Sequence, residues 1–85
     1  MRPTSYRIEY SRSAISDLDN LPARIRAQLL RKIERLHDGL HGNIKRLTKD
    51  DYTYRLRMGD YRVLFDVEGK LIIIRRVGHR KEIYG

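Results

Sequence analysis

The last third of the chain holds three apolar runs separated by two very short breaks, and this spacing most constrains the fold. The runs cover residues 54–57, 61–67 and 70–77, are rich in Val, Ile, Tyr and Phe, and are separated by breaks that each contain a glycine. Apolar runs bounded by turn residues are typical of strands joined as hairpins. A parallel connection needs a dozen or more residues, so these breaks allow only antiparallel neighbours. The sequence therefore predicts an antiparallel meander.

The first half of the chain predicts one strand followed by two helices. Residues 6–10 alternate apolar and charged side chains, as a half-buried strand does. A short helix capped by Ser11 or Ser13 is expected next. A second, amphipathic helix is expected from Pro22 as its first residue to about Leu40. Its apolar stripe consists of Ile25, Leu29, Ile33, Leu36 and Leu40. The order βααβββ predicts an α+β fold in which two N-terminal helices pack on one face of an antiparallel sheet.

Length and composition exclude several classes of protein. At 85 residues without cysteine, the chain is expected to form a single domain, residues 1–85, with no disulfide and no thiolate metal site. No apolar run approaches the roughly 18 residues of a membrane span, so a soluble cytoplasmic protein without membrane contact is expected. His37 and His41 have the spacing of two ligands on a helix, but Gly39 lies between them and no third ligand is near. Neither a metal nor another cofactor is expected.

Positive charge is the strongest global feature. Lys and Arg number 19 against 11 Asp and Glu, which gives a formal net charge of +8. The positive electrostatic potential of such a protein predicts a polyanionic partner, either nucleic acid or an acidic protein. Alternation along the predicted strands places Arg55, Arg57 and Arg62 together on the face without helices.

Two further segments leave alternatives open. Segment 43–53 is expected to be a polar connection that can add a short strand at the edge of the sheet. Its Lys45 and Lys49 form either a phosphate-contacting rim or a charged guard against unwanted strand pairing. In the last run, strict alternation predicts a central strand with apolar residues on both faces. The two predicted sets are Leu71, Ile73 and Arg75 on one face, and Ile72, Ile74 and Arg76 on the other.

The residues that remain for chemistry are arginines, a histidine and a tyrosine near the end of the chain. RNA can be cleaved by attack of its own 2′-hydroxyl on the adjacent phosphate. This reaction needs a base to take the 2′ proton, cations to stabilise the negative phosphorane, and help for the departing 5′ oxygen. Arginines such as Arg62 and Arg80 suit the second role because guanidinium matches phosphate geometry. Tyr84 could act as the base only if neighbouring cations lowered its pKa from about 10. His79 could act as acid or base, bind RNA, or have no role.

Two segments resemble the RelE branch of the RelE/ParE toxin superfamily. They are R-x-G-D-Y-R-V at 57–63 and V-G-H-R-K-E-I-Y at 77–84, and the resemblance extends over essentially the whole chain. It implies the toxin of a type II toxin–antitoxin pair, which enters the ribosomal A site and cuts mRNA without a metal. It also implies an acidic antitoxin that wraps around the toxin and brings the complex to operator DNA.

The resemblance also implies residue roles. Arg62 would contact the scissile phosphate, Arg80 would stabilise the transition state, and Tyr84 would be the candidate base, with His79 as the alternative. Some members carry a second lysine where this chain has Thr53. The expected substrate-binding residues are Arg55, Arg57, Lys45, Lys49 and His79.

Two other functions remain open at this point. A ParE-like toxin would have the same fold and bind DNA gyrase without acting as an enzyme. A plain RNA- or DNA-binding module would explain the charge. Because an inhibitor has no need for a phosphate-and-base set, the presence of Arg62, Arg80 and Tyr84 together favours the nuclease.

Overall fold

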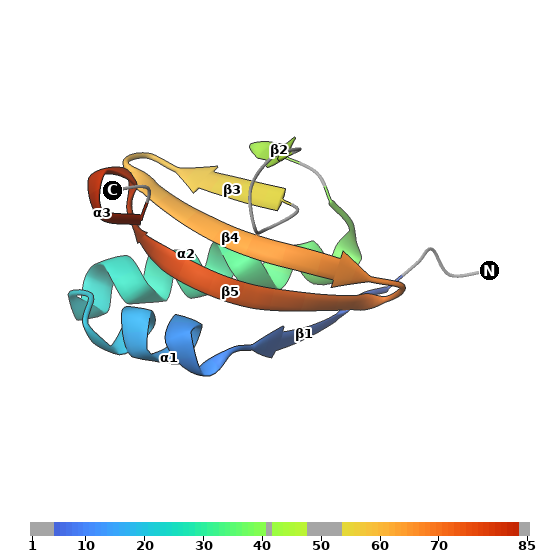
Figure 1. Cartoon of the computed structure of the whole chain (residues 1–85), viewed down its shortest axis with the longest axis horizontal. Coiled ribbons are helices and arrows are strands. Elements are labelled where there is room, and N and C mark those ends of the chain that lie inside the picture. The colour runs from blue at the N-terminus through green and yellow to red at the C-terminus, as the bar shows by residue number, and fades with distance from the viewer. Residues whose placement is uncertain (1–4, 41, 48–53, 84–85) are drawn as a thin grey trace.

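The computed structural model describes residues 5–40, 42–47 and 54–83, which form one mixed sheet with helices packed against it (Figure 1). The sheet has five strands in the order β1-β5-β4-β3-β2. The strands are β1 (Arg7–Tyr10), β2 (Ile44–Arg46), β3 (Tyr54–Met58), β4 (Tyr61–Glu68) and β5 (Leu71–His79). The predicted meander is confirmed by the antiparallel pairing of β3, β4 and β5.

The sheet departs from the expected pattern at both of its edges. β1 pairs with β5 in parallel, so the sheet is mixed and not antiparallel throughout. The two helices between β1 and the later strands give the connection the length that parallel pairing needs. At the opposite edge, β2 adds the short strand expected in segment 43–53 and pairs antiparallel with β3.

The helices begin where the sequence signals place them, within one residue. They are α1 (Arg12–Asp19), α2 (Ala23–Glu34), a 3-10 turn η1 (Arg35–Asp38) and a short C-terminal helix α3 (Arg80–Ile83). The side chain of Ser11 caps α1 by accepting the N–H of Ala14 at 3.1 Å. Pro22 is the N-cap of α2 and not its first residue, and the last part of the predicted helix is η1. The separate helix α3 was not predicted.

The core lies between α2 and the sheet. Leu29, Ile33 and Leu36 of the predicted stripe are fully or almost fully buried, and Ile25 and Leu40 border them. They meet a strand layer of Leu56, Val63, Phe65, Ile72, Ile74 and Val77. Among the described residues, no helix is long and apolar enough to cross a membrane.

A bulge in β5 breaks the strict alternation predicted for the last strand. Phe65 pairs with Ile74, whereas its neighbour Leu64 pairs with Arg76, so Arg75 is an extra residue in the ladder. The side chains after the bulge therefore exchange faces. The placement of Arg76 on the same face as Ile72 and Ile74 was wrong: Val77 occupies that side and is buried in the core.

Candidate nucleic-acid interface

Four basic side chains lie on the sheet face that α2 does not cover. Arg57 of β3 is directly opposite Arg62 of β4, and Arg55 is directly opposite Lys45 of β2. Their strand neighbours, such as Leu56, are buried in the core on the other face. The structure thus brings together four of the residues expected to bind substrate or phosphate. Lys49 and Tyr84 lie outside the described residues, as do His41 and Thr53.

Arg62 has an unusual environment for a residue expected to contact substrate. Its side chain is folded back, with Nη1 donating to the carbonyl oxygen of Gly59 at 2.7 Å and to that of Tyr61 at 3.0 Å. The residue is only 8 % exposed. Its Nε is buried and has no hydrogen-bond partner within the described part of the chain, which is rare for a guanidinium. In this conformation Arg62 holds the turn between β3 and β4.

A glycine on the next strand gives Arg62 its space. Gly78 is the cross-strand partner of Arg62 on β5, so no side chain stands beside the guanidinium at that position. A Cβ at residue 78 would lie 3.9 Å from the Cβ of Ile83 in α3, an ordinary contact distance. The short helix α3 therefore packs closely over this end of β5.

The turn that Arg62 holds is joined to the start of α3. The backbone N–H of Arg80 donates to the carbonyl oxygen of Asp60 at 2.8 Å. The Nε of Arg80 lies 3.8 Å from a carboxylate oxygen of Asp60, which is beyond hydrogen-bond range. The Arg80 side chain is 52 % exposed. Its guanidinium is thus positioned through its backbone and accessible to an anion.

His79 has its ring fixed by two contacts. The ring meets Tyr61 edge-on, with centroids 5.6 Å apart. Its Nδ1 accepts the backbone N–H of Lys81 at 3.1 Å. A nitrogen that accepts a hydrogen bond carries no proton, so the neutral ring has its proton on Nε2. In this tautomer the Nε2–H of His79 is a hydrogen-bond donor.

Sequence reasoning missed the role of Asp17. This helical carboxylate accepts the Nε–H of Arg76 at 2.7 Å and the backbone N–H of Val77 at 2.9 Å. It thereby pairs with an arginine beside the basic face and ties α1 to β5. Asp17 occupies an ordinary polar position in a helix, so no sequence pattern marks it.

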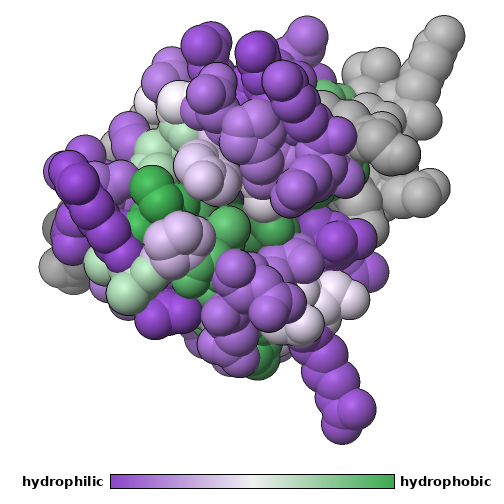
Figure 2. All heavy atoms as spheres, turned by 90° about the vertical axis from the view of Figure 1, so that its left-hand side faces the viewer, coloured by the Kyte–Doolittle hydropathy of each residue, from purple (hydrophilic) through white to green (hydrophobic). Residues whose placement is uncertain are grey.

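A small cleft lies beside the basic site, in the part of the chain that the structure describes. A cleft of about 70 Å3 beside α3, lined in part by Asp17, Gly78 and Ile83, is too small for a nucleotide. Seen from this end of the molecule, charged and polar side chains surround a band of hydrophobic ones (Figure 2). No group of three or more potential metal ligands occurs among the described residues. A ligand of this surface would be bound by charge and by contact with a broad face.

Comparison with known proteins assigns the family. A family model described as the ParE toxin of the type II toxin-antitoxin system parDE matches residues 8–84. This chain belongs to the RelE/ParE toxin family. Toxin RelE3 of Methanocaldococcus jannaschii is 34% identical over 83 residues, which cover 92% of this chain and 94% of that protein. The RelE-family identity agrees with the resemblance of the two sheet segments.

Two solved structures of RelE-family complexes support the same assignment. The RelB–RelE antitoxin–toxin complex from Methanococcus jannaschii matches with a TM-score of 0.74 and 34% identity, over 89% of this chain and 94% of that chain. The RelBE2 toxin–antitoxin complex from Mycobacterium tuberculosis matches with a TM-score of 0.79 and 28% identity, over 91% and 100% of the two chains. This chain is therefore a type II RelE-family toxin with the α+β fold of that family.

Proposed function

We propose that this toxin is a ribosome-dependent endoribonuclease that cleaves mRNA in the ribosomal A site and so inhibits translation. One observation carries the proposal: the basic face formed by Lys45, Arg55, Arg57 and Arg62 ends at the exposed guanidinium of Arg80. The cations line a path for an RNA backbone, and the accessible arginine stands where a phosphate would arrive.

The chemistry we propose needs no metal. A base removes the proton of the 2′-hydroxyl, the 2′ oxygen attacks the adjacent phosphorus, and the 5′ oxygen leaves with a proton. The products are a 2′,3′-cyclic phosphate and a 5′-hydroxyl. Arg80 stabilises the negative phosphorane, and the Nε2–H of His79 can donate a hydrogen bond to the departing oxygen, which takes its proton from water. Tyr84, which follows α3 directly in the chain, is our candidate for the base.

We assign Arg62 a role in both structure and substrate contact. Its bonds to the carbonyl oxygens of Gly59 and Tyr61 hold the turn that supports Arg80. Its unpaired Nε is a donor that an RNA phosphate could satisfy if the short helix α3 moved aside. Arg57, the cross-strand partner of Arg62, is exposed and available to a phosphate without such a movement.

The partner that we propose for this toxin is a cognate acidic antitoxin. The net charge of +8 favours the binding of an acidic partner. The similar structures from Methanococcus jannaschii and Mycobacterium tuberculosis are toxin–antitoxin complexes. We propose that this toxin likewise forms a hetero-oligomer, reaches operator DNA only through its antitoxin, and acts in the cytoplasm, where its ribosomal target is found.

A second function has one observation in its favour, namely that the matching family model bears the ParE name. On this alternative, the toxin binds DNA gyrase and performs no chemistry. The exposed Arg80 beside the fixed ring of His79 favours the nuclease. A gyrase inhibitor needs no hydrogen-bond donor next to an arginine that could bind phosphate.

Primer extension on a defined mRNA in a reconstituted translation system separates the two functions. We expect wild-type toxin to produce cuts within the A-site codon, in a reaction that needs ribosomes. Arg80→Ala should reduce cleavage by about a hundredfold, the usual effect of removing one group that stabilises a transition-state charge. Arg57→Ala and Tyr84→Phe should also reduce it. Arg24→Ala, the same change at an exposed position of α2, is the matched control and should cleave normally.

Two results would contradict the nuclease. The first is an absence of cuts by folded wild-type protein, and the second is equal cleavage by wild type and Arg80→Ala. Inhibition of DNA supercoiling by gyrase under the same conditions would then establish the ParE-like function.

A further inference from the structure

One large hydrophobic side chain is exposed on α1. Ile15 is 49 % exposed, and it is the only large hydrophobic side chain with such exposure among the described residues. Asp17 follows two positions later, about 200° around the helix. Because the carboxylate of Asp17 bonds to β5, Ile15 lies on the side of α1 turned away from that strand. A single exposed isoleucine is ordinary on a protein surface, so its surroundings decide whether it has a function.

Ile15 borders an apolar hollow between α1, α2 and the end of β1. The hollow has a volume of about 220 Å3, and its lining is almost entirely apolar. The residues that line it are Tyr10, Ile15, Leu18, Asp19, Arg26 and Leu30. Leu18 is buried in the core, and Tyr10 and Leu30 are half-buried against it. A projecting apolar side chain thus stands directly beside an apolar depression.

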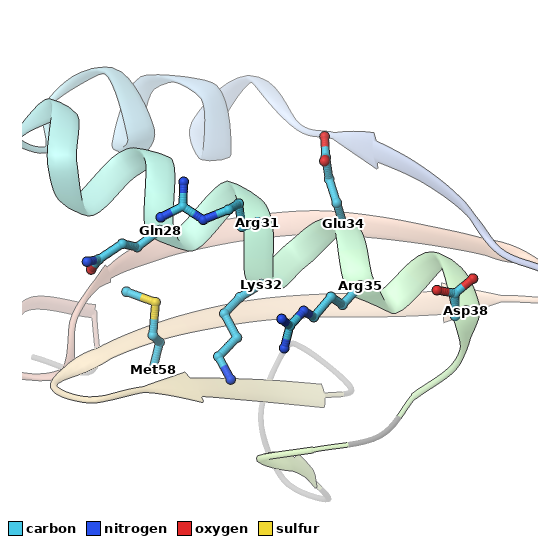
Figure 3. A pocket seen from close by; sticks show the side chains of 7 residues that line it. All are labelled: Gln28, Arg31, Lys32, Glu34, Arg35, Asp38 and Met58. Carbon is cyan, nitrogen blue, oxygen red and sulfur yellow. The ribbon is translucent and has the colours of Figure 1, made fainter.

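The side of α2 that lines the hollow differs in charge from its other side. A groove of about 580 Å3 follows the other side, where Lys32 and Arg35 extend toward the strands (Figure 3). Glu34 extends the opposite way, toward β1 (Figure 3). Leu30 and Arg26 precede Glu34 by four and eight positions, so they share its side of the helix. Charges of both signs therefore lie on the side of the hollow.

The rim of the hollow holds one acid and one base that do not pair with each other. Asp19 is exposed and forms no ion pair with any described residue. Arg26 makes only a long hydrogen bond, 3.4 Å from Nη1 to the carbonyl oxygen of Leu18, and no described carboxylate pairs with it. Opposite charges on one patch can pair across a two-fold axis, so this patch is complementary to itself.

We propose that the free toxin forms a symmetric homodimer through this hollow. The partner is a second copy of the same chain, and two-fold symmetry brings the same patch of both copies together. Ile15 of each protomer packs into the hollow of the other. Asp19 of each protomer pairs with Arg26 of the partner subunit. The dimer goes beyond the cleavage and antitoxin proposals and depends on neither.

Charge favours a second copy of the chain over a polyanion at this patch. A nucleic-acid backbone would meet the carboxylate of Asp19 and would gain nothing from the apolar floor. The net charge of +8 opposes the approach of two copies elsewhere, so a patch with balanced charges is where they can meet. α2 lines the hollow and covers the sheet face opposite the arginines, so this contact leaves the basic face of each protomer accessible.

Sedimentation equilibrium of the purified toxin tests the proposal. We expect the average mass to rise from that of one chain toward that of two at concentrations up to about 200 μM, as for a small interface. Ile15→Glu should dimerise at least tenfold more weakly, because the hollow would have to take up a carboxylate without a partner. The matched control is Ser13→Glu, at an exposed position of the same helix outside the hollow, and it should dimerise within threefold of wild type.

A reciprocal charge exchange tests the two-fold symmetry. Asp19→Arg and Arg26→Asp should each dimerise at least tenfold more weakly than wild type, because each variant places like charges at both contacts. An equimolar mixture of the two variants should dimerise as wild type does, because opposite charges then meet at both contacts. Failure of the mixture to dimerise would overturn the proposed arrangement, even if each variant alone is weakened.

Salt separates this dimer from binding of nucleic acid. Screening reduces the repulsion between two chains of charge +8, so dimerisation should strengthen between about 50 and 300 mM NaCl. Binding of RNA to the basic face should weaken over the same range. A dimer that dissociates as salt is added would show that the apolar hollow does not hold it, and would contradict the proposal.

Three further results would overturn the dimer. One is a wild-type toxin that stays monomeric at all of these concentrations, and another is equal dimerisation by wild type and Ile15→Glu. The third is a monomeric toxin whose antitoxin binding is lost in Ile15→Glu, which would assign the hollow to the antitoxin. Ile15→Glu should cut mRNA as wild type does. If wild type itself fails to cut, the nuclease proposal fails, while sedimentation still decides the role of the hollow.

Discussion

The carboxylate of Asp17 accepts the backbone N–H of Val77 at 2.9 Å and so continues the edge of the sheet beyond the point where β1 ends. β1 accompanies β5 only as far as Ile74. From there, α1 takes over the free edge, since the hydroxyl of Ser11 donates to the carbonyl oxygen of Arg75 at 2.9 Å. Side chains of one helix thus replace a missing strand along the part of β5 that leads to His79.

Asp17→Ala should lower the free energy of unfolding by about 2 kcal/mol, because it removes an acceptor from Val77 and an ion partner from Arg76. The expected loss of stability is modest because the Arg76 side chain is 43% exposed and water can replace part of the ion pair. Urea unfolding measures the change. Asp19→Ala, at an exposed position of the same helix, is the control and should change stability by less than about 0.5 kcal/mol. Equal losses in the two variants would contradict the role given to Asp17.

Arg62→Ala should reduce both stability and cleavage. It leaves the carbonyl oxygens of Gly59 and Tyr61 without their donor, and we expect a loss of about 1–3 kcal/mol in the free energy of unfolding. Arg80→Ala removes a half-exposed guanidinium and should reduce cleavage without a comparable loss. Thermal unfolding followed by primer extension separates the two effects. An Arg62→Ala protein as stable as wild type would show that the turn does not depend on this side chain.

The two hairpin glycines offer a matched pair for testing the turn. Gly59 and Gly69 have φ angles of +58° and +60°, and a Cβ at either position would meet nothing within 4 Å. Alanine at each should therefore cost a similar amount of backbone strain, about 1–2 kcal/mol. Only Gly59 lies in the turn whose carbonyl oxygens accept hydrogen bonds from Arg62 and Arg80. We therefore expect the two variants to be equally stable, and Gly59→Ala to reduce cleavage several-fold more than Gly69→Ala. Equal activities would argue against coupling between this turn and the site.

Tyr10 should make stability depend on alkaline pH. Its burial, and secondly the negative charge of Glu34, raise the pKa of Tyr10 above the ordinary value of 10.0. The folded state therefore favours the neutral phenol. This contribution is complete below pH about 10 and is lost as the pH rises through the raised pKa. The free energy of unfolding of wild type should thus fall relative to that of Tyr10→Phe between pH 9 and 11.5 in urea titrations. A constant difference would contradict the shift.

Local patterns in the sequence were sufficient for most of the fold. Turn glycines and alternating strands predicted the meander, and Ser11 and Pro22 marked the two helix starts, because these signals act within a few residues. The parallel partner of β1 was missed because the pairing joins residues far apart in the chain. The bulge at Arg75 was missed as well, because strict alternation assumes that every residue of the strand is paired and a bulge inserts one extra residue.

The candidate site was only partly predictable for a related reason. Alternation correctly grouped Arg55, Arg57 and Arg62 on one face, and the resemblance to RelE toxins pointed to Arg80. The sequence contained no sign that Arg62 would fold back on its own turn, because that depends on the room left by Gly78 on a neighbouring strand. The interactions of Asp17 likewise arise only when α1 meets β5.

The position of β5 in the sheet also orders events during synthesis. β5 lies between β1 and β4 in the sheet, yet it follows all the other strands in the chain. Arg7 of β1 pairs with Leu71 of β5, so β1 cannot pair until β5 has been synthesised. Contacts between such distant residues form slowly and late. A nascent chain that has made β1, α1 and α2 therefore has no central strand on which to close. The basic surface on β3 and β4 and the site beside α3 should therefore assemble only after the ribosome has made β5 and α3.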